Sequence, residues 1–338
     1  MKKNIFSLMF VFTLSIMLFS CAKKTTVTTV IPVTPTIPVT SLISLPIGWK
    51  ISTSFGTSFP TGIQVYQYDT IFLGKRVKAF CVAYDSKNTA IEFKPIMAST
   101  ATTPSTFSSN ESGVVYACIN GGYFGSNQSY SLVKYNNVVS SANIKALTRT
   151  YYGVNTSYYP TRAAFGVDAA GTPSIGWIYN VGSGNDLIYN YPSPSPNLLG
   201  SAPQPLPTAT FPANGTIWNT TSAIGGSPVL IKNNSIQITA NEELIDVNNA
   251  SSRPRSAIGY TNNGIVLILA VEGDNPPTYT GINLADLAAL QQSLGATNAI
   301  NLDGGGSTSL IIGGLRTVRP GDNGVERPVV SAILIKKK

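Results

Sequence analysis

Hydrophobic and polar positions alternate in short segments after about residue 48, and Asn, Gly, Pro and Ser residues separate these segments. Such alternation is typical of β-strands with one buried face, and the separating residues favour turns. We interpret the proline-rich stretch 180–214 as a long loop that forms a lid or the rim of a site. The predicted strands cover residues 64–72, 76–84, 114–119, 163–167, 174–179 and 227–232.

One helix stands out against this β-rich background. Leucines recur at helical spacing from Leu284 to Leu294, which places them on one side of a helix. Asn283 precedes the first of them and is a favourable N-cap, whereas Gly295 follows the last and favours termination. The pattern therefore predicts a helix over residues 284–294.

Continuous apolar runs flank this helix at residues 264–271 and 299–302. A strand, a helix and a strand at this spacing form a βαβ unit, so we expect the two strands to be parallel and neighbouring. The first strand ends at Glu272 and Asp274 and the second at Asp303, so these carboxylates should converge at one sheet edge. The expected fold class is α+β, with mixed β-sheets, few helices and one βαβ unit near the C-terminus.

The N-terminus has the pattern of an export signal. Lys2 and Lys3 precede an apolar run at residues 5–19, which is too short to span a membrane, and Cys21 follows at the position of a lipid-bearing residue. We expect residues 1–20 to be a lipoprotein signal peptide and Cys21 to be the acylated N-terminus. A signal peptide that is cleaved without lipidation is the alternative.

Residues 21–47 are rich in Thr, Val and Pro and show no amphipathic pattern. This composition favours an extended tether, although a short edge strand remains open. Residues 48–338 would then form one domain. The expected location is the bacterial cell envelope, lipid-anchored at the outer membrane on its periplasmic or surface face, with the membrane contacted through the lipid.

The composition limits which catalytic groups, metal sites and partners are possible. The chain has no histidine, which excludes Ser-His and Cys-His catalysis and His-ligated zinc. The net charge of +8 is scattered without a basic stripe, so nucleic acid is not an expected partner. Cys81 and Cys118 are either a disulfide or two buried free thiols. The sequence requires no cofactor, leaves Ca²⁺ or Mg²⁺ open on oxygen ligands, and does not define an oligomeric state.

The segment NLDGGGSTS places Asp303 before three consecutive glycines. Clustered carboxylates raise one another's pKa, and glycine N–H groups form nests for anions. Asp303 is the first catalytic candidate, and a glycine-rich turn capped by Asp303 is the alternative. The substrate-binding candidates in this segment are Gly304, Gly305, Gly306, Ser307 and Thr308.

Arginines supply groups that bind phosphate. Arg253 and Arg255 precede one strand, and Arg162 begins another. Guanidinium groups bind phosphate bidentately, but each of these arginines has an equal claim to a structural ion pair.

The segment INGGYF ends another predicted strand in an amide and two glycines. Asn120 is a candidate to bind a sugar hydroxyl, with Gly121 and Gly122 giving close access to the backbone. The same residues also suit an ordinary turn.

Together these segments resemble the phosphodiester glycosidase family. The matching pieces are INGGYF at 119–124, RAAFGVDAAG at 162–171, IGGSPVLI at 224–231, RPRSAIGY at 253–260 and NLDGGGSTSL at 301–310, with ERPVVSAI near the end. The resemblance implies cleavage of a sugar from a sugar-1-phosphate diester, with Asp303, Arg255 and Asn120 as the functional residues. It departs from the family at Glu272-Gly273-Asp274, where members usually have Asp-Gly-Arg, so the substrate is expected to differ or a divalent cation to bridge the acids.

Two functions follow. The first is a lipid-anchored glycoside hydrolase with Asp303, Glu272 and Arg255 as catalytic residues and a carbohydrate or sugar phosphate as substrate. The second is a non-catalytic glycan-binding envelope lipoprotein on the same fold, which the altered Glu272-Gly273-Asp274 segment favours.

Overall fold

β-Strands form most of the regular structure, as the alternating pattern predicts. The computed structural model describes residues 40–55 and 59–338, of which 41–338 form one compact unit. The expected signal peptide, Cys21 and most of the expected tether lie outside the described residues. Within them the helices are short: α1 (Pro104–Asn110), α2 (Leu284–Ser293) and the 3-10 turn η1 (Gly305–Ser307). None is long and apolar enough to cross a membrane.

The largest sheet has eight strands in the order β1-β2-β3-β20-β19-β21-β17-β18. Every neighbouring pair in it is antiparallel. Its strands are β1 (Trp49–Ile51), β2 (Ile63–Phe72), β3 (Lys75–Asp85), β20 (Ile265–Val271), β19 (Arg255–Tyr260), β21 (Asn298–Asn301), β17 (Val229–Lys232) and β18 (Ser235–Ile236).

A seven-stranded and a five-stranded sheet complete the unit, with two separate hairpins. The seven strands are, in order, β15 (Thr216–Ile217), β14 (Ile188–Tyr191), β13 (Pro173–Asn180), β12 (Arg162–Val167), β16 (Ser222–Gly225), β8 (Val133–Tyr135) and β9 (Val138–Ser141). The five are β23 (Leu315–Arg316), β22 (Leu310–Ile312), β5 (Val115–Asn120), β24 (Val329–Lys337) and β4 (Ile91–Thr102). The hairpins are β10 (Leu147–Tyr151) with β11 (Val154–Tyr158), and β6 (Phe124–Gly125) with β7 (Gln128–Ser129).

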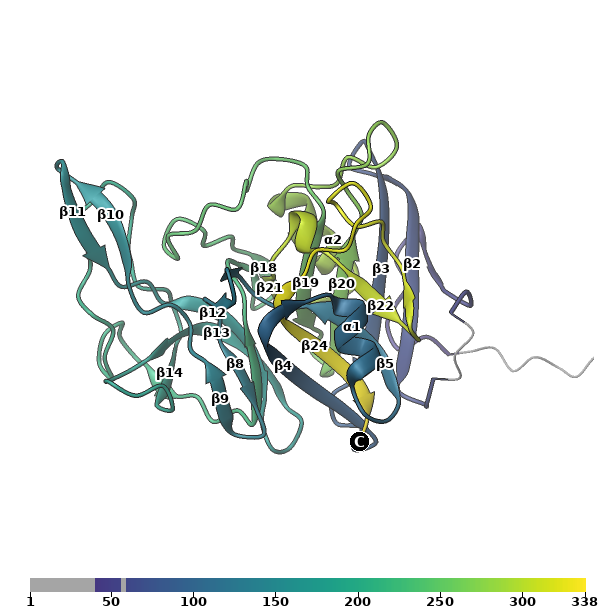
Figure 1. The fold of residues 1–338 in the computed structure, drawn as a ribbon, viewed down its shortest axis with the longest axis horizontal. Coiled ribbons are helices and arrows are strands. Elements are labelled where there is room, and N and C mark those ends of the chain that lie inside the picture. Colours follow the sequence, from purple (N-terminus) through teal and green to yellow (C-terminus); the bar gives the residue numbers. More distant parts are fainter. Residues whose placement is uncertain (1–39, 56–58) are drawn as a thin grey trace, which may run out of the picture. The chain divides into compact units, whose positions relative to one another are not determined.

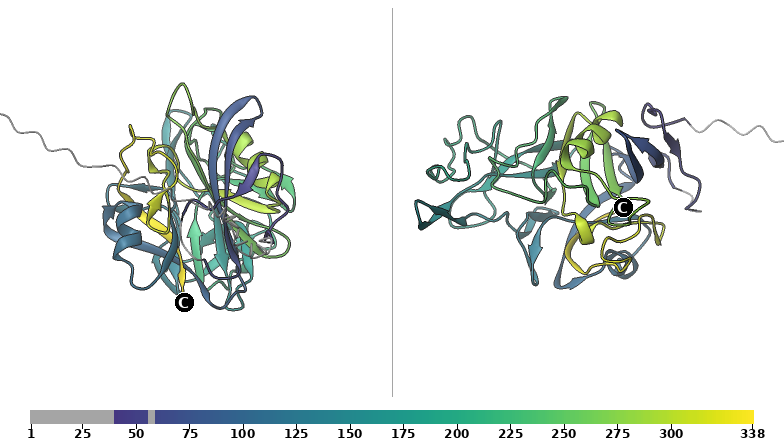
Figure 2. Two further views of the ribbon diagram at one scale, coloured as in Figure 1. Left: turned by 90° about the vertical axis from the view of Figure 1, so that its right-hand side faces the viewer. Right: turned by 90° about the horizontal axis from the view of Figure 1, so that it is seen from above.

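The main core lies where the three sheets face one another (Figure 1). It joins Val82 and Ile268 of the eight-stranded sheet to Phe165 and Trp177 of the seven-stranded sheet and Ile333 of the five-stranded sheet. Period-2 alternation sends the neighbouring side chains of the eight-stranded sheet to its other face, which α2 covers. Figure 2 shows α1 and α2 on opposite sides of this unit.

The predicted strands and the helix are confirmed to within a few residues, and the βαβ unit β20-α2-β21 is present. The expectation that its two strands are neighbours is wrong, because β19 lies between them and pairs antiparallel with both. Residues 261–264 form a short turn that pairs β19 with β20 as a hairpin. The α2 crossover then places β21 on the far side of β19. The stretch 180–214 is also not all loop, because it contains β14.

Both remaining cysteines are free thiols. Cys81 lies in β3 of the eight-stranded sheet and Cys118 in β5 of the five-stranded sheet, and both are buried. Burial raises the pKa of each thiol, which makes both unreactive at neutral pH. Of the two alternatives that the sequence left open, the structure therefore has the buried free thiols.

Candidate active site around Asp303

Asp303 follows β21, and the end of β5 fixes its backbone. The Asn120 side chain donates to the Asp303 carbonyl at 2.7 Å, and the Asp303 N–H donates to the Gly121 carbonyl at 3.2 Å. Asn120 is fully buried, and its oxygen accepts from the Ser256 hydroxyl at 2.8 Å. Gly121 and Gly122 lie where neighbouring chain segments leave no room for a side chain. Asn120 therefore positions Asp303 in this structure and does not face a ligand.

Three glycines are needed after Asp303 because the chain bends tightly and passes close to its neighbours. Gly305 has a φ of +59°, which favours glycine. A Cβ on Gly304 would lie 3.0 Å from the Pro254 carbonyl oxygen, and one on Gly306 would lie 2.1 Å from the Asp322 carboxylate. We call residues 303–308 the Asp303 bend.

The Asp303 bend differs from the anion nest that the sequence suggests. The Gly304 N–H donates to the Asp303 carboxylate at 2.9 Å, and the Gly305 N–H donates to the Pro254 carbonyl at 2.9 Å. The N–H groups of Gly304 and Gly305 are therefore already paired. The glycines act by allowing close packing against Pro254 more than by offering donors to an anion.

The Asp303 carboxyl group is half-buried and poorly compensated. Burial raises its pKa from the ordinary 3.8 to about 6. The Ser307 hydroxyl, the Gly304 N–H and the charge of Arg327 act in the opposite direction but do not cancel the effect of burial. Asp303 therefore changes its protonation state close to neutral pH, as expected for a group that takes part in chemistry.

Arg327 and Asp322 close one side of the bend. The two Arg327 nitrogens Nε and Nη2 each lie 2.7 Å from an Asp322 oxygen, in a bidentate pair. Arg327 Nη1 lies 3.5 Å from the Ser307 hydroxyl, at the limit of a hydrogen bond. The Thr308 hydroxyl is buried and has no partner among the described residues. Arg327 is thus the cation beside Asp303.

Arg255 lies beside the bend through its Cα and Cδ atoms, but its guanidinium group is engaged elsewhere. A Cβ on Gly304 would lie 3.8 Å from Arg255 Cδ. The guanidinium donates to the carbonyl oxygens of Val247, Asn248, Ser251 and Ile282 at 2.8–3.1 Å. Arg255 is 2% exposed. In this structure Arg255 holds the segment 247–251 in place and leaves little capacity for a phosphate.

Tyr123 connects Asp303 to the buried arginines. Its hydroxyl donates to the Ser227 carbonyl at 2.5 Å and accepts from the Asn301 side chain at 2.6 Å. Burial, and then the charge of Asp303, raise the pKa of Tyr123, whereas the nearby charges of Arg162 and Arg255 lower it. Tyr123 is therefore a neutral hydroxyl between one acid and two cations.

Arg162 begins β12 and is 7% exposed. Its Nη2 donates to the Leu244 carbonyl at 3.3 Å, and its Nε has no partner among the described residues. Burial is the main cause that lowers the pKa of Arg162; the charge of Glu243 acts in the opposite direction, and the nearby charge of Arg149 lowers it further. Arg162 thus carries a buried charge with little hydrogen bonding to compensate it.

Glu243 is the acid on that side, and no sequence motif marked it as a candidate. It is fully buried, and its carboxylate accepts five hydrogen bonds, from the Ala163, Val229, Trp177, Ser227 and Thr239 groups at 2.6–3.1 Å. Burial raises the pKa of Glu243, and these hydrogen bonds act against that rise. Its role is to join three strands, because Ala163 lies in β12, Trp177 in β13 and Val229 in β17.

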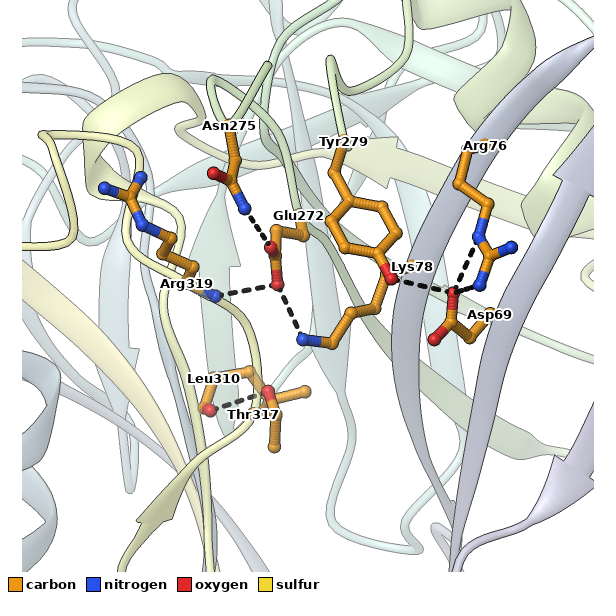
Figure 3. Close-up of polar contacts among 9 residues, drawn as sticks. All are labelled: Asp69, Arg76, Lys78, Glu272, Asn275, Tyr279, Leu310, Thr317 and Arg319. Carbon is orange, nitrogen blue, oxygen red and sulfur yellow. Dashed lines mark hydrogen bonds and ion pairs between the residues drawn. The ribbon is translucent and has the colours of Figure 1, made fainter. Parts of the chain in front are cut away.

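Glu272 lies at the end of β20 in a separate corner with Lys78, Asn275 and the backbone of Arg319 (Figure 3). The carboxylate accepts from Lys78 at 3.0 Å, from the Arg319 N–H at 3.0 Å and from the Asn275 side chain at 3.0 Å. It is 2% exposed. We call these four residues the Glu272 corner, and its carboxylate is fully paired and shielded from a ligand.

Asp274 and Arg253 also lie at this sheet edge, but they contact each other. Arg253 Nη1 lies 3.6 Å from an Asp274 oxygen, and both side chains are partly exposed. Within residues 40–55 and 59–338, no three Cys, Asp or Glu side chains are grouped so that they could hold a metal ion. A bridging Ca²⁺ or Mg²⁺ stays a prediction.

The sheet edge thus separates the candidates into groups. Asp303, Tyr123, Arg327 and the Cα and Cδ atoms of Arg255 are brought together, and Asn120 positions Asp303. Glu272 is linked to this group through the segment after Arg319, since Gly321 packs against Gly305, and through Pro254, which lies against both Gly273 and Gly304. β19 separates the strands that carry Glu272 and Asp303, so the two carboxylates do not form a pair.

This geometry can be compared with known proteins. The phosphodiester glycosidase family model matches residues 113–336, which is more than half of the chain. The chain belongs to the phosphodiester glycosidase family. The matched region of this family member contains β5, Asp303 and both buried arginines.

Sequence relatives match over short segments. An SPbeta prophage-derived uncharacterized protein, YomE of Bacillus subtilis, is 37% identical over 82 residues, which cover 24% of this chain and 12% of the relative. The Bos taurus N-acetylglucosamine-1-phosphodiester alpha-N-acetylglucosaminidase is 36% identical over 69 residues, which cover 20% of this chain and 13% of that enzyme. The aligned segments therefore span only about an eighth of these relatives.

Solved structures share the fold more completely. The catalytic domain of the zebrafish N-acetylglucosamine-1-phosphodiester alpha-N-acetylglucosaminidase, auto-inhibited by its pro-peptide, is similar with a TM-score of 0.56 at 15% identity, covering 86% of this chain and 89% of that domain. A hypothetical protein from Synechocystis is similar with a TM-score of 0.55 at 20% identity, covering 87% of this chain and 69% of the other. At these identities the likeness shows the fold alone.

Proposed function

We propose that this family member is a lipid-anchored hydrolase that releases a sugar from a sugar-1-phosphate diester in a glycan. The observation that carries the proposal is Asp303, a half-buried carboxyl group with a pKa of about 6 on a tightly held bend. A phosphate monoester is a good leaving group, so the reaction depends less on a strong general acid. The main requirement is a carboxylate that stabilises the oxocarbenium-like transition state.

The proposal assigns distinct roles to the candidate residues. Asp303 acts in its ionised form at neutral pH, because that pH lies above its pKa. Asn120 and the glycines of the Asp303 bend are positioning residues. Glu272 and Arg255 stabilise the surrounding loops, since their polar atoms are already paired within the protein.

The test is release of free sugar from a sugar-1-phosphate diester by the wild type and by Asp303→Asn. We expect the variant to lose about 10³-fold in kcat, within the range for removing one charged catalytic group. The control is Asp186→Asn, which changes an exposed acid that is not part of the Asp303 bend. Equal turnover by wild type and Asp303→Asn would exclude Asp303 from the chemistry.

A non-catalytic glycan-binding protein is the second candidate. Asp274 stands where the family usually has arginine, and Glu272 and Arg255 are fully engaged within the protein. Glycan binding without hydrolysis, with and without added Ca²⁺ or Mg²⁺, would favour this function.

The lipid anchor and the cell-envelope location are part of the proposal and rest on Cys21. Intact-mass analysis of the protein from bacterial membranes should show a processed, acylated N-terminus. Cys21→Ala should abolish that mass and release the protein from the membrane fraction. A wild-type mass that lacks any lipid would exclude the anchor.

A further inference from the structure

A cavity of about 490 Å³ opens beside the β10–β11 hairpin. Arg149 of β10, Leu199 of the stretch 180–214 and the segment 240–251 contribute to its wall. Figure 1 shows the hairpin standing away from the three large sheets. The volume lies within the range of about 300–1,000 Å³ that is common for small-molecule sites.

The wall of this cavity is supported by buried arginines. Arg162 Nη2 holds the Leu244 carbonyl, and Arg255 Nη2 holds the Asn248 and Ser251 carbonyls at 2.8 and 2.9 Å. Leu244, Asn248 and Ser251 all line the cavity. Two cations that are almost inaccessible to water therefore lie directly behind the wall.

Arg149 provides the cation at the cavity surface. It is half-buried and donates to the Thr148 carbonyl at 2.9 Å, and its remaining N–H groups have no partner among the described residues. Arg149 is also near enough to Arg162 to lower the pKa of that group. A guanidinium with free donors is suited to bidentate contact with a phosphate.

The acids nearby do not neutralise this group. Asp246 lines the cavity but is exposed, and one of its oxygens accepts from the Asn248 N–H at 3.0 Å. Glu243 lies behind the wall with five hydrogen-bond donors of its own. An anion in the cavity would therefore offset repulsion between Arg149 and Arg162.

Arg255 lies against both the cavity wall and the Asp303 bend. Tyr123 is close enough to Asp303, Arg162 and Arg255 for the charge of each to change its pKa. The Cα and Cδ atoms of Arg255 lie beside Gly304 of the bend, and its guanidinium holds the cavity wall. A substrate with its sugar at Asp303 would direct its phosphate-bearing part toward the arginines.

We propose that this cavity binds the phosphate and the adjoining part of the leaving group of the sugar phosphodiester, with Arg149 as the contacting cation. The inference rests on the proposed function and specifies which end of the substrate the hairpin recognises. It predicts that the released phosphomonoester inhibits the enzyme by occupying this cavity. It also predicts a preference for leaving groups that carry a phosphate over uncharged aglycones.

The test is calorimetric titration of the intact protein with glycerol 3-phosphate, a simple phosphomonoester, and separately with inorganic phosphate and with free glycerol. We expect Arg149→Ala to weaken binding of glycerol 3-phosphate by about tenfold or more, as for loss of one charge-assisted contact. Arg149→Lys should retain part of the affinity. Arg316→Ala, which removes an exposed arginine on β23, should leave it unchanged.

The outcomes separate this inference from the proposed function. Equal affinity of wild type and Arg149→Ala, or no binding of glycerol 3-phosphate to the wild type, would overturn the inference even if sugar release is observed. Binding that depends on Arg149 without sugar release would support the anion site and contradict only the hydrolase. Equal binding of inorganic phosphate and glycerol 3-phosphate would show that the adjoining group is not recognised and would overturn that part.

Discussion

The Asp303 bend and the Glu272 corner each place one carboxyl group at the same end of the eight-stranded sheet, but their surroundings differ. Glu272 is 2% exposed and is paired with Lys78 and two N–H groups. Asp303 is half-buried and has one backbone N–H, the Ser307 hydroxyl and the more distant charge of Arg327. Position at a strand end therefore does not make a carboxyl group reactive. What matters is how far hydrogen bonds and opposite charge compensate its burial.

The largest expected effect is the loss of stability on removing Glu272. Glu272→Ala leaves the Lys78 ammonium and two N–H groups without their partner, which should cost roughly 3–5 kcal/mol. Urea unfolding of the wild type, Glu272→Ala and the double variant Lys78→Met/Glu272→Met would measure this. The double variant should recover part of the loss, because it removes both charges. A Glu272→Ala protein of wild-type stability would show that the corner is not an anchor.

At Asp303, by contrast, substitution of the carboxyl group is expected to stabilise the folded protein. Its pKa is about 6 in the folded protein and 3.8 ordinarily, so folding disfavours the ionised form. The resulting cost is present in full above pH 6, decreases as the pH falls from 6 to 4, and is absent below the ordinary pKa. Asp303→Asn should therefore stabilise the protein by up to about 3 kcal/mol at pH 8 and by almost nothing at pH 3.5. A stability difference that is equal at both pH values would contradict the raised pKa.

Activity should follow the same titration. If the ionised Asp303 stabilises the transition state, kcat/KM should fall about tenfold for each pH unit below about pH 6, which gives the pH profile an acid limb. Initial rates from pH 4.5 to 8.5 at constant ionic strength would locate that limb. A limb in the opposite direction, with activity lost above pH 6, would show that the protonated Asp303 acts as a general acid.

The smallest effect concerns Arg327. Its charge lowers the pKa of Asp303, so Arg327→Gln should move the acid limb to higher pH by less than about one unit. Arg327→Lys keeps the charge and should move the limb less. Equal shifts in both variants would indicate that the Asp322 pair acts by packing and not through its charge.

The sequence could predict strands and carboxylate positions, but not how their polar groups are paired. The apolar run of β20 and the leucine spacing of α2 have a local period, so both were predictable. The insertion of β19 between β20 and β21 depends on which hairpin forms, and no local period records that choice. Likewise, the engagement of Arg255 with backbone carbonyls depends on the path of an irregular segment, residues 247–251.

The same limit applies to the candidate site. The glycines after Asp303 suggested either an anion nest or a turn capped by Asp303, and the structure has a tightly packed bend whose Gly304 N–H is capped by the Asp303 carboxylate. The cavity beside Arg149 could not be predicted, because its wall combines the separate hairpin with the segment 240–251 and part of the stretch 180–214. The one related prediction was that the stretch 180–214 forms a lid or the rim of a site.

The hydrogen bond from Asn120 to the Asp303 carbonyl crosses between two sheets. This hydrogen bond originates at the last residue of β5. The Asp303 carboxylate is therefore aligned by the five-stranded sheet as well as by the eight-stranded sheet that carries it. Substitutions far from the site that shift one sheet against the other would therefore alter turnover before they alter ligand affinity. Variants selected for heat resistance at this inter-sheet junction should accordingly change catalytic rate even though they touch no substrate.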